Sequence, residues 1–579
     1  MRPGLLSLQI TTCLFFFFFF FFFSFSFHAS VYSPSFQVYN YWEPLHFMLH
    51  GTGFQTWEYS SAFALRPWAY LALHAPAALL GRALGLGGGA GVRAALATAT
   101  AASETALFVA LRDVAGPGAA LGYLALALPS PGLYAAAPAL LPSSFVMVAH
   151  AACTAATLRL VGGPVSGRGG AAARAIVAAA VGLLWGWPVA APAFVPAALA
   201  VLALAPSTLT ALCVSAAALV ALLPPLILAD KLAYGRWTVS LLNFLAYNVR
   251  GGGESALYGV EPPSFYGNAL LLGCGLAAPL ALGAPFLAWA AGTRGGQARS
   301  PASPPLRGAR AVIVGAGLPA ALWVGAISLL PHKEDRFLYP VLPALHAAAG
   351  LGLACLPPAL RAVSGVPFTT AGRAGRAAGG VAGAVAVAAA ALGLARSAAL
   401  VTYYSAPRTI WAALPPHPGP AFTPDMPALV CMGQEWHRYP GAFSLPASAA
   451  HLYKPAFVRS PFRGLLPVPF DRASGGASAS PPTLNDRNRH EPANELADAS
   501  TCAFFVGVAP ENGGDAPDTG REWEVLKSAR FVDVGGRRDR AGLGRWLHVP
   551  GVPGLDGAGN AWVRYVLLRQ RTKVGTVFL

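Results

Sequence analysis

The sequence predicts an α-helical protein that crosses a membrane about ten times and ends in a soluble α+β domain. Three observations predict this class. Of the 579 residues, 55% are hydrophobic and only 11% are charged, whereas soluble proteins carry about 25% charged residues. Apolar segments long enough to cross a bilayer, roughly 20 residues, recur along the first 400 positions. After residue 400 the sequence contains no such segment, but it has short strand-like pieces such as WVRYVLL at 562–568.

The predicted membrane spans lie between residues 69 and 400. One stretch, 175–229, contains no charged residue and has room for two long spans or three short ones. The other predicted spans are 69–86, 92–111, 119–141, 144–160, 268–292, 311–330, 337–356 and 380–400. Together they define a membrane-embedded domain at 38–400, followed by a soluble domain at 401–579.

The loops between the spans are of two chemical types. Loops 159–174, 294–310 and 361–376 contain Arg and no acid, which predicts a cytosolic position. Loops 40–66, 230–268 and 331–336 mix acids, aromatic residues and His, and are predicted to face the lumen with the tail. Membrane orientation therefore explains the net charge of +16 better than a nucleic-acid surface does, because no aromatic-interleaved basic patch is present.

The first mixed loop contains a candidate sugar-binding site. Aromatic rings stack on sugar rings, and the neighbouring carboxylates and amides bind hydroxyl groups. The residues concerned are Trp42, Glu43, Gln55, Trp57, Glu58 and Arg66. The alternative interpretation is an interfacial aromatic belt accompanied by a few solvated charges.

A second candidate site consists of five consecutive ionisable residues, 332–336, at a predicted membrane boundary. Such residues are costly to desolvate there and are usually functional. His332, Lys333 and Arg336 are cations suited to a lipid phosphate, and Glu334 is suited to orient them or to bind sugar hydroxyls. The alternative is a solvated turn that fixes two helix ends.

The seven cysteines form no CxxC pair and no Cys/His cluster, so the sequence predicts no zinc or iron–sulfur site. Cys431 and Cys502 both lie in the tail. They are able to pair in an oxidising compartment, and the unpaired alternative stays open.

Several motifs together resemble glycosyltransferase family 22. They are YWEPLH at 41–46, HKEDRFLYP at 332–340, LLPSSFVM at 140–147 and GWP at 186–188, and the similarity extends over nearly everything after Val38. This resemblance implies the GT-C fold and a location in the endoplasmic reticulum membrane. It also implies a mannosyltransferase that takes dolichyl-phosphate-mannose as substrate and needs no cofactor or metal.

Tail motifs at 431–440, 462–470 and 485–492 resemble the family members that build the N-glycan precursor. Those members add α-1,2-mannose to dolichyl-diphosphate oligosaccharides with six or eight mannoses. Two alternatives remain. The family's GPI-anchor mannosyltransferases share the first loop and the HKE motif. A polytopic transporter would explain the spans, but not the tail or the Trp/Glu loop.

The resemblance implies an inverting single displacement, in which a lumenal carboxylate is the general base and cations stabilise the departing phosphate. The family places an Asp-Glu pair just before the aromatic loop. This chain has Phe36 and Gln37 at those positions, so the catalytic base is unassigned.

Residues 1–37 form a doubtful N-terminus that contains nine consecutive Phe, at 15–23. Phe and Ser can both be encoded by pyrimidines alone. We therefore expect a retained intron upstream of Val38, which would also explain the missing acidic pair. The competing interpretation is a signal-anchor core.

Overall fold

The computed structural model describes residues 35–250, 257–293, 304–364, 373–520, 522–533 and 542–571. The predicted retained-intron segment up to residue 34 lies outside them, as do parts of the Arg-rich loops 294–310 and 361–376. The chain divides into two compact units. Among the described residues, one contains Arg93–Leu226 and Tyr258–Arg396, and the other contains 35–92, Ile227–Leu257 and the tail from Ser397.

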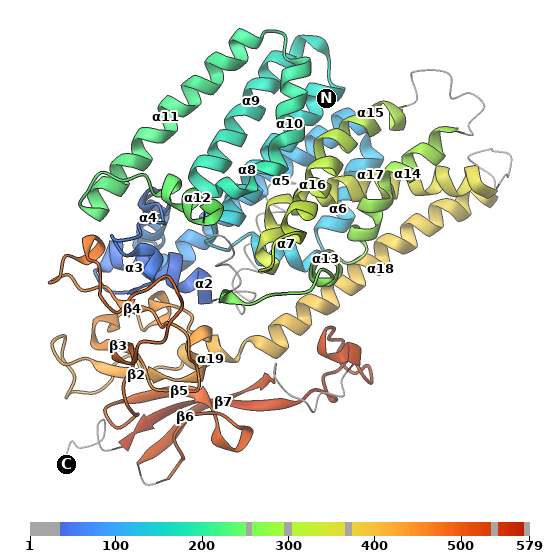
Figure 1. Ribbon diagram of the computed structural model, residues 1–579. Helices are drawn as coiled ribbons and strands as arrows, with labels where there is room; N and C mark the ends of the chain where they lie inside the picture. Colours follow the sequence, from blue (N-terminus) through green and yellow to red (C-terminus); the bar gives the residue numbers. More distant parts are fainter. Residues whose placement is uncertain are drawn as a thin grey trace. The chain divides into compact units, whose positions relative to one another are not determined.

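The first unit is a bundle of helices (Figure 1). Its helices are α6 (Pro117–Ala127), α7 (Pro131–Ala136), α8 (Pro142–Gly162), α9 (Arg168–Val181), α10 (Ala191–Leu204), α13 (Phe265–Cys274), α14 (Ala277–Thr293), α15 (Pro304–Val312), α16 (Leu318–Ser328) and α17 (Leu342–Ser364). Three long helices have residues in both units: α5 (Gly88–Ala115), α11 (Thr208–Tyr234) and α18 (Arg373–Tyr404).

Within the described residues, seven helices are long and apolar enough to cross a membrane. The number becomes eight if the bent pair Phe265–Cys274 and Ala277–Gly292 forms one span. This finding confirms the polytopic helical class, with fewer spans than the ten expected.

Turn residues account for the lower number of spans. The predicted span 69–86 is α4 (Trp68–Ala83), which has 16 residues and is followed by Gly85 and Gly87 at positive φ. The predicted span 119–141 is broken into α6 and α7, because Pro131 begins a new helix whose N-cap is Ser130. The predicted span 268–292 bends by 98° at Gly275.

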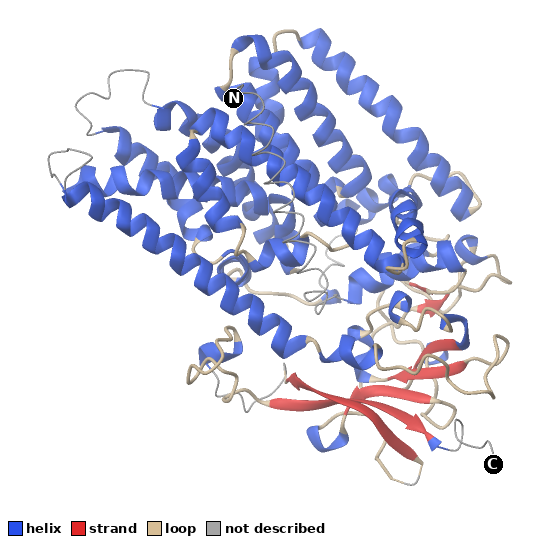
Figure 2. Cartoon of the chain, turned by 180° about the vertical axis from the view of Figure 1, so that it is seen from behind, coloured by secondary structure: helices blue, strands red, loops and turns tan. Residues whose placement is uncertain are grey.

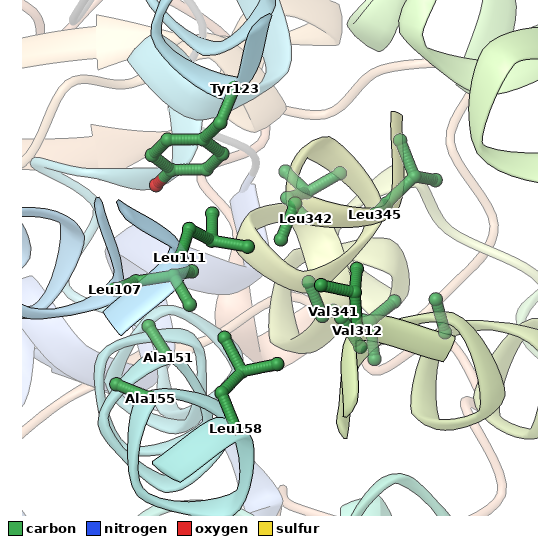
Figure 3. Packing of buried hydrophobic residues seen from close by; sticks show 14 of the residues in the cluster. Leu107, Leu111, Tyr123, Ala151, Ala155, Leu158, Val312, Val341, Leu342 and Leu345 are labelled. Atoms are coloured by element: carbon green, nitrogen blue, oxygen red, sulfur yellow. The ribbon is translucent and has the colours of Figure 1, made fainter. Parts of the chain in front are cut away.

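Small residues allow the helices of the first unit to pack closely. Leu107 and Leu111 of α5 belong to one buried cluster with residues of α8 and α17 (Figure 3). Helices α6 and α17 approach so closely that a Cβ on Gly350 would lie 2.5 Å from the backbone nitrogen of Tyr123. Only glycine permits this approach, which is how membrane helices gain packing contacts without a hydrophobic driving force between them.

The tail folds into a mixed five-stranded sheet (Figure 2). Its strand order is β3 (Tyr453–Phe457), β2 (Ala428–Met432), β5 (Phe504–Val508), β7 (Trp562–Gln570) and β6 (Trp523–Val532). Strand β2 is parallel to both β3 and β5, and β7 is antiparallel to β5 and β6. The predicted strand at 562–568 is confirmed as β7. Cys431 of β2 is disulfide-bonded to Cys502, which decides the pairing that the sequence left open.

The second unit also contains the first mixed loop. Short helices α2 (Ser35–Gln37) and α3 (Glu43–His50) precede strand β1 (Phe54–Gln55), which pairs with β4 (Val468–Pro469) of the tail. Helices α12 (Ser240–Arg250) and α19 (Ala406–Trp411) complete the unit. Packing therefore combines the first loop and the 227–257 region with the tail, although the sequence separates them by long apolar stretches.

Candidate functional site

Glu43 links the first loop to the tail through hydrogen bonds to its carboxylate. Its side chain is buried, with the residue 1% exposed. Oε2 accepts the N–H of Phe54 at 3.0 Å and Oε1 accepts the N–H of Ala442 at 2.6 Å. Burial raises the pKa of Glu43 to about 7, although these two hydrogen bonds act to lower it. In this conformation Glu43 positions backbone, and the predicted contact with a sugar hydroxyl would require these bonds to open.

The two tryptophans of the loop are also buried. The Trp42 ring packs edge-on against Phe443, with the ring centres 5.8 Å apart. The Trp57 ring lies 5.1 Å from Phe63 and 5.3 Å from Tyr247. Protein side chains therefore cover both rings, and the described conformation leaves little of either ring open to a sugar.

Gln55 has a different environment. It is fully buried, and neither its amide nitrogen nor its amide oxygen has a hydrogen-bond partner among the described residues. A buried amide without a partner costs about 1–3 kcal/mol. A ligand hydroxyl, which both donates and accepts, would remove that cost, so Gln55 is the polar group of the loop best suited to a substrate contact.

Glu58 and Arg66 form an ion pair with 2.6 Å between Oε1 and Nη2. Arg66 also donates to the Tyr41 hydroxyl at 3.1 Å, and its guanidinium lies 4.8 Å from the centre of the Phe36 ring. The Phe36 ring therefore packs against the Arg66 guanidinium, and Gln37 beside it is buried. A phenyl ring and a carboxamide cannot act as a general base, so neither residue supplies the missing carboxylate.

Asp230 positions two helices of the second unit. Its Oδ1 accepts the N–H of Trp68, the first residue of α4, at 3.1 Å. Its Oδ2 accepts the N–H and the hydroxyl of Ser240, the first residue of α12, at 3.0 and 2.5 Å. One carboxylate therefore satisfies the N-termini of two helices. The sequence signal was a single acid after a long uncharged stretch, but its two partners were not predictable.

The cluster at 332–336 forms a network centred on Glu334. His332 Nε2 lies 3.1 Å from Glu334 Oε1, and Arg336 donates to the same oxygen. Burial raises the pKa of Glu334, but the charge of Arg336 and the hydrogen bonds from His332 and Arg336 outweigh it and lower the pKa to about 2. The hydrogen bond that His332 donates to Glu334 raises the pKa of His332. The network thus keeps Glu334 ionised and favours a cationic His332.

Lys333 has a different role in this structure. It is 6% exposed, and its ammonium donates to the carbonyl oxygens of Glu261 and Leu330 at 3.1 and 2.6 Å. The bond to Glu261 joins the cluster to the segment YGVEP at 258–262, as does the contact of 3.0 Å between His332 Nδ1 and the Gly259 carbonyl. Lys333 is one of the three predicted phosphate-binding cations. In this structure its ammonium is hydrogen-bonded to backbone carbonyl oxygens instead.

The structure groups the predicted site residues in two sets. The first-loop residues lie together in the second unit, and His332 to Arg336 lie together in the first. Sequence reasoning missed Glu104, an acid within span α5 that is fully buried and whose carboxylate has no partner among the described residues. Its signal was a lone acid in an apolar span. Within the described part of the chain, no group of three His, Cys, Asp or Glu residues could hold a metal ion.

The apolar spans and the mixed-sheet domain define a multi-span membrane protein with an ionisable network at a span boundary. The model of the Alg9-like mannosyltransferase family matches residues 12–446. The chain therefore belongs to the Alg9-like mannosyltransferase family, and the resemblance to glycosyltransferase family 22 is confirmed.

Curated relatives include proteins named Alpha-1,2-mannosyltransferase ALG9. The one from Arabidopsis thaliana is 34% identical over 81% of this chain and 77% of the relative. The one from Homo sapiens is 29% identical over 92% of this chain and 85% of the relative. The Schizosaccharomyces pombe protein is 30% identical, over 82% and 80% respectively.

Among solved structures, the apo form of ArnT from Cupriavidus metallidurans is similar with a TM-score of 0.47 and 16% identity, covering 87% of this chain and 93% of ArnT. Oligosaccharyltransferase AglB from Archaeoglobus fulgidus has a TM-score of 0.39 and 13% identity, covering 75% and 60%.

Proposed function

We propose that this protein transfers mannose from dolichyl-phosphate-mannose, in α-1,2 linkage, to the dolichyl-diphosphate oligosaccharide precursor of N-glycosylation. Its acceptors would be the six- and eight-mannose intermediates. The observation that carries the proposal is family membership over residues 12–446, together with relatives named α-1,2-mannosyltransferase in plants, animals and fungi.

The network of His332, Glu334 and Arg336 supports a role in handling the donor phosphate. The leaving group is a lipid phosphate whose negative charge grows as the glycosidic bond breaks. A guanidinium held in place by Glu334 is preorganised to stabilise that charge without reorganising during the reaction. Dolichyl-phosphate-mannose is a substrate in this proposal and no cofactor is involved.

Two other functions fit fewer observations. A GPI-anchor mannosyltransferase would share the first loop and the 332–336 cluster, but not the tail motifs that resemble the N-glycan branch. A transporter without transferase activity would account for the spans alone, and family membership disfavours it.

The activity is tested with microsomes from cells that lack the endogenous enzyme and express this chain. We expect radiolabelled mannose to pass from dolichyl-phosphate-mannose to a dolichyl-diphosphate oligosaccharide, whose size increases by one mannose. Transfer to a GPI intermediate alone would contradict the N-glycan acceptor and leave the mannosyltransferase class intact. Absence of any transfer, with the protein present, would contradict the proposal.

We further propose that the protein lies in the endoplasmic reticulum membrane with its tail in the lumen. The Cys431–Cys502 disulfide supports this orientation, since disulfides persist in oxidising compartments. The Arg-rich loop 361–376, which the span Gly379–Tyr404 separates from the tail, supports it independently by the positive-inside rule.

Two single substitutions test the orientation, because the sequence contains no Asn-X-Ser/Thr acceptor site. Arg472→Asn creates one before Ala473 and Ser474 in an exposed tail loop, and Pro164→Asn creates one in the exposed loop between α8 and α9. We expect endoglycosidase-sensitive glycosylation of the tail variant only. Glycosylation of the Pro164→Asn variant instead would show that the orientation is opposite to the proposed one.

A further inference from the structure

The tail segment 542–555 is attached to the end of the last membrane span. Tyr403 is the penultimate residue of α18, and its hydroxyl lies 3.0 Å from His548 Nδ1. The rings of these two residues pack edge-on with centres 5.3 Å apart, and Trp562 of β7 packs against the same tyrosine at 5.6 Å. These contacts lie within the second unit, so the position of the segment relative to the helix end is fixed by described geometry.

The length of the span places this attachment near the membrane surface. The apolar helix Gly379–Tyr404 contains 26 residues, and a rise of 1.5 Å per residue gives it a length of about 39 Å. A bilayer measures about 30 Å across its hydrocarbon core and about 40–45 Å with its headgroups. Tyr403 therefore lies at headgroup level, which is where Tyr is enriched in membrane helices.

Residues 549–555 form two successive tight turns. The N–H of Val552 donates to the Val549 carbonyl and the N–H of Leu555 donates to the Val552 carbonyl. Each turn has a Pro-Gly pair at its centre, and Gly551 and Gly554 adopt φ of +75° and +80° as such turns require. A third bond from the Val549 N–H to the Leu555 carbonyl closes the structure. Val552 is thus presented at a rigid tip.

The segment exposes apolar side chains that a purely water-facing turn would not need. Leu543 is 69% exposed, Trp546 is 38% exposed and Val552 is 40% exposed. Arg545 lies beside the Trp546 ring, 5.9 Å from its centre. Exposed Trp and aliphatic residues next to a basic residue are the composition of surfaces that bind at the lipid headgroup boundary.

We propose that segment 542–555 is a membrane-contact loop. It inserts Leu543, Trp546 and Val552 into the headgroup region of the same bilayer that α18 crosses, and so holds the soluble domain against the membrane surface. This contact is independent of the reaction catalysed and of the side of the membrane on which the tail lies.

The test uses the full-length protein reconstituted in liposomes that contain lipids with a nitroxide on the headgroup. Val552→Cys and Leu543→Cys are labelled separately with an environment-sensitive fluorophore. Ser528→Cys, on exposed strand β6 of the same domain, is the matched control. The unsubstituted chain measures labelling of native cysteines such as the exposed Cys213.

We expect the probes at 543 and 552 to emit at shorter wavelength than the probe at 528. We also expect several-fold stronger quenching of these two by the nitroxide lipid, and weaker quenching by aqueous iodide. Equal behaviour of all three positions would overturn the proposal. Protection from both lipid and aqueous quenchers would also overturn it, because that result indicates a protein partner on the loop.

Discussion

Substitution of Arg336 by alanine is expected to slow mannose transfer by more than tenfold, because loss of a hydrogen-bonded charge partner costs about 1.5–3 kcal/mol. Arg336 is 8% exposed and shares the Glu334 carboxylate with His332. Its removal takes away the fixed cation proposed to face the donor phosphate. It also removes the ion pair and the hydrogen bond that Arg336 makes with Glu334. We expect the loss in kcat and in kcat/KM for dolichyl-phosphate-mannose, because the phosphate charge that Arg336 stabilises develops in the transition state.

Two further variants separate this role from general destabilisation. Arg336→Lys keeps the charge but not the forked guanidinium geometry, so partial recovery is expected. Arg112→Ala removes a partly exposed Arg that pairs with the adjacent Asp113, and should leave donor kinetics unchanged. Protein amounts in the membrane are compared by immunoblot. Normal donor kinetics in Arg336→Ala would contradict the proposed role in phosphate binding. That result would support the alternative, in which the cluster is a solvated turn that fixes two helix ends.

Glu43→Ala is expected to destabilise the protein by about 2–6 kcal/mol, because two buried backbone N–H groups lose their acceptor at about 1–3 kcal/mol each. These donors belong to Phe54 of the first loop and Ala442 of the tail. Loss of the contact should loosen the loop from the tail. The measurement is the thermal unfolding midpoint of the purified protein in detergent, with partial protease digestion of the tail as a second readout.

The stability contributed at Glu43 should also depend on pH. Its folded-state pKa of about 7 exceeds its ordinary value of 4.5, so the folded protein binds the proton more tightly than the unfolded chain. The stability contributed by protonation of Glu43 is therefore fully present below pH 4.5, and it is lost as the pH rises through 7. A shift of this size corresponds to about 3 kcal/mol.

Glu43→Gln provides the matched control, since its carboxamide does not titrate. Between pH 5 and pH 8 we expect the unfolding midpoint of the unsubstituted protein to fall relative to that of Glu43→Gln. Parallel pH profiles for the two proteins would contradict a raised pKa. An unchanged midpoint in Glu43→Ala would show that Glu43 does not join the loop to the tail.

Hydropathy predicted the spans well where the chain is straight. Predicted spans at 92–111, 144–160 and 311–330 correspond to α5, α8 and the helix Gly308–Ser328. It failed where backbone geometry interrupts an apolar stretch, as at Pro131 and Gly275. A hydropathy average is insensitive to one residue, whereas a single proline or a left-handed glycine redirects a whole helix.

The sequence by itself determined the membrane class, strand β7 and the ionisable cluster at 332–336, because each depends on residues that are close together along the chain. Only the tertiary structure decided that Glu43 is bound by Ala442, that Asp230 satisfies α4 and α12, that Lys333 is taken up by carbonyl oxygens and that Cys431 pairs with Cys502. The physical reason is that a buried polar group is satisfied by whichever donor or acceptor the fold places beside it. For Glu43 that donor lies 399 positions along the chain, where no local pattern records it.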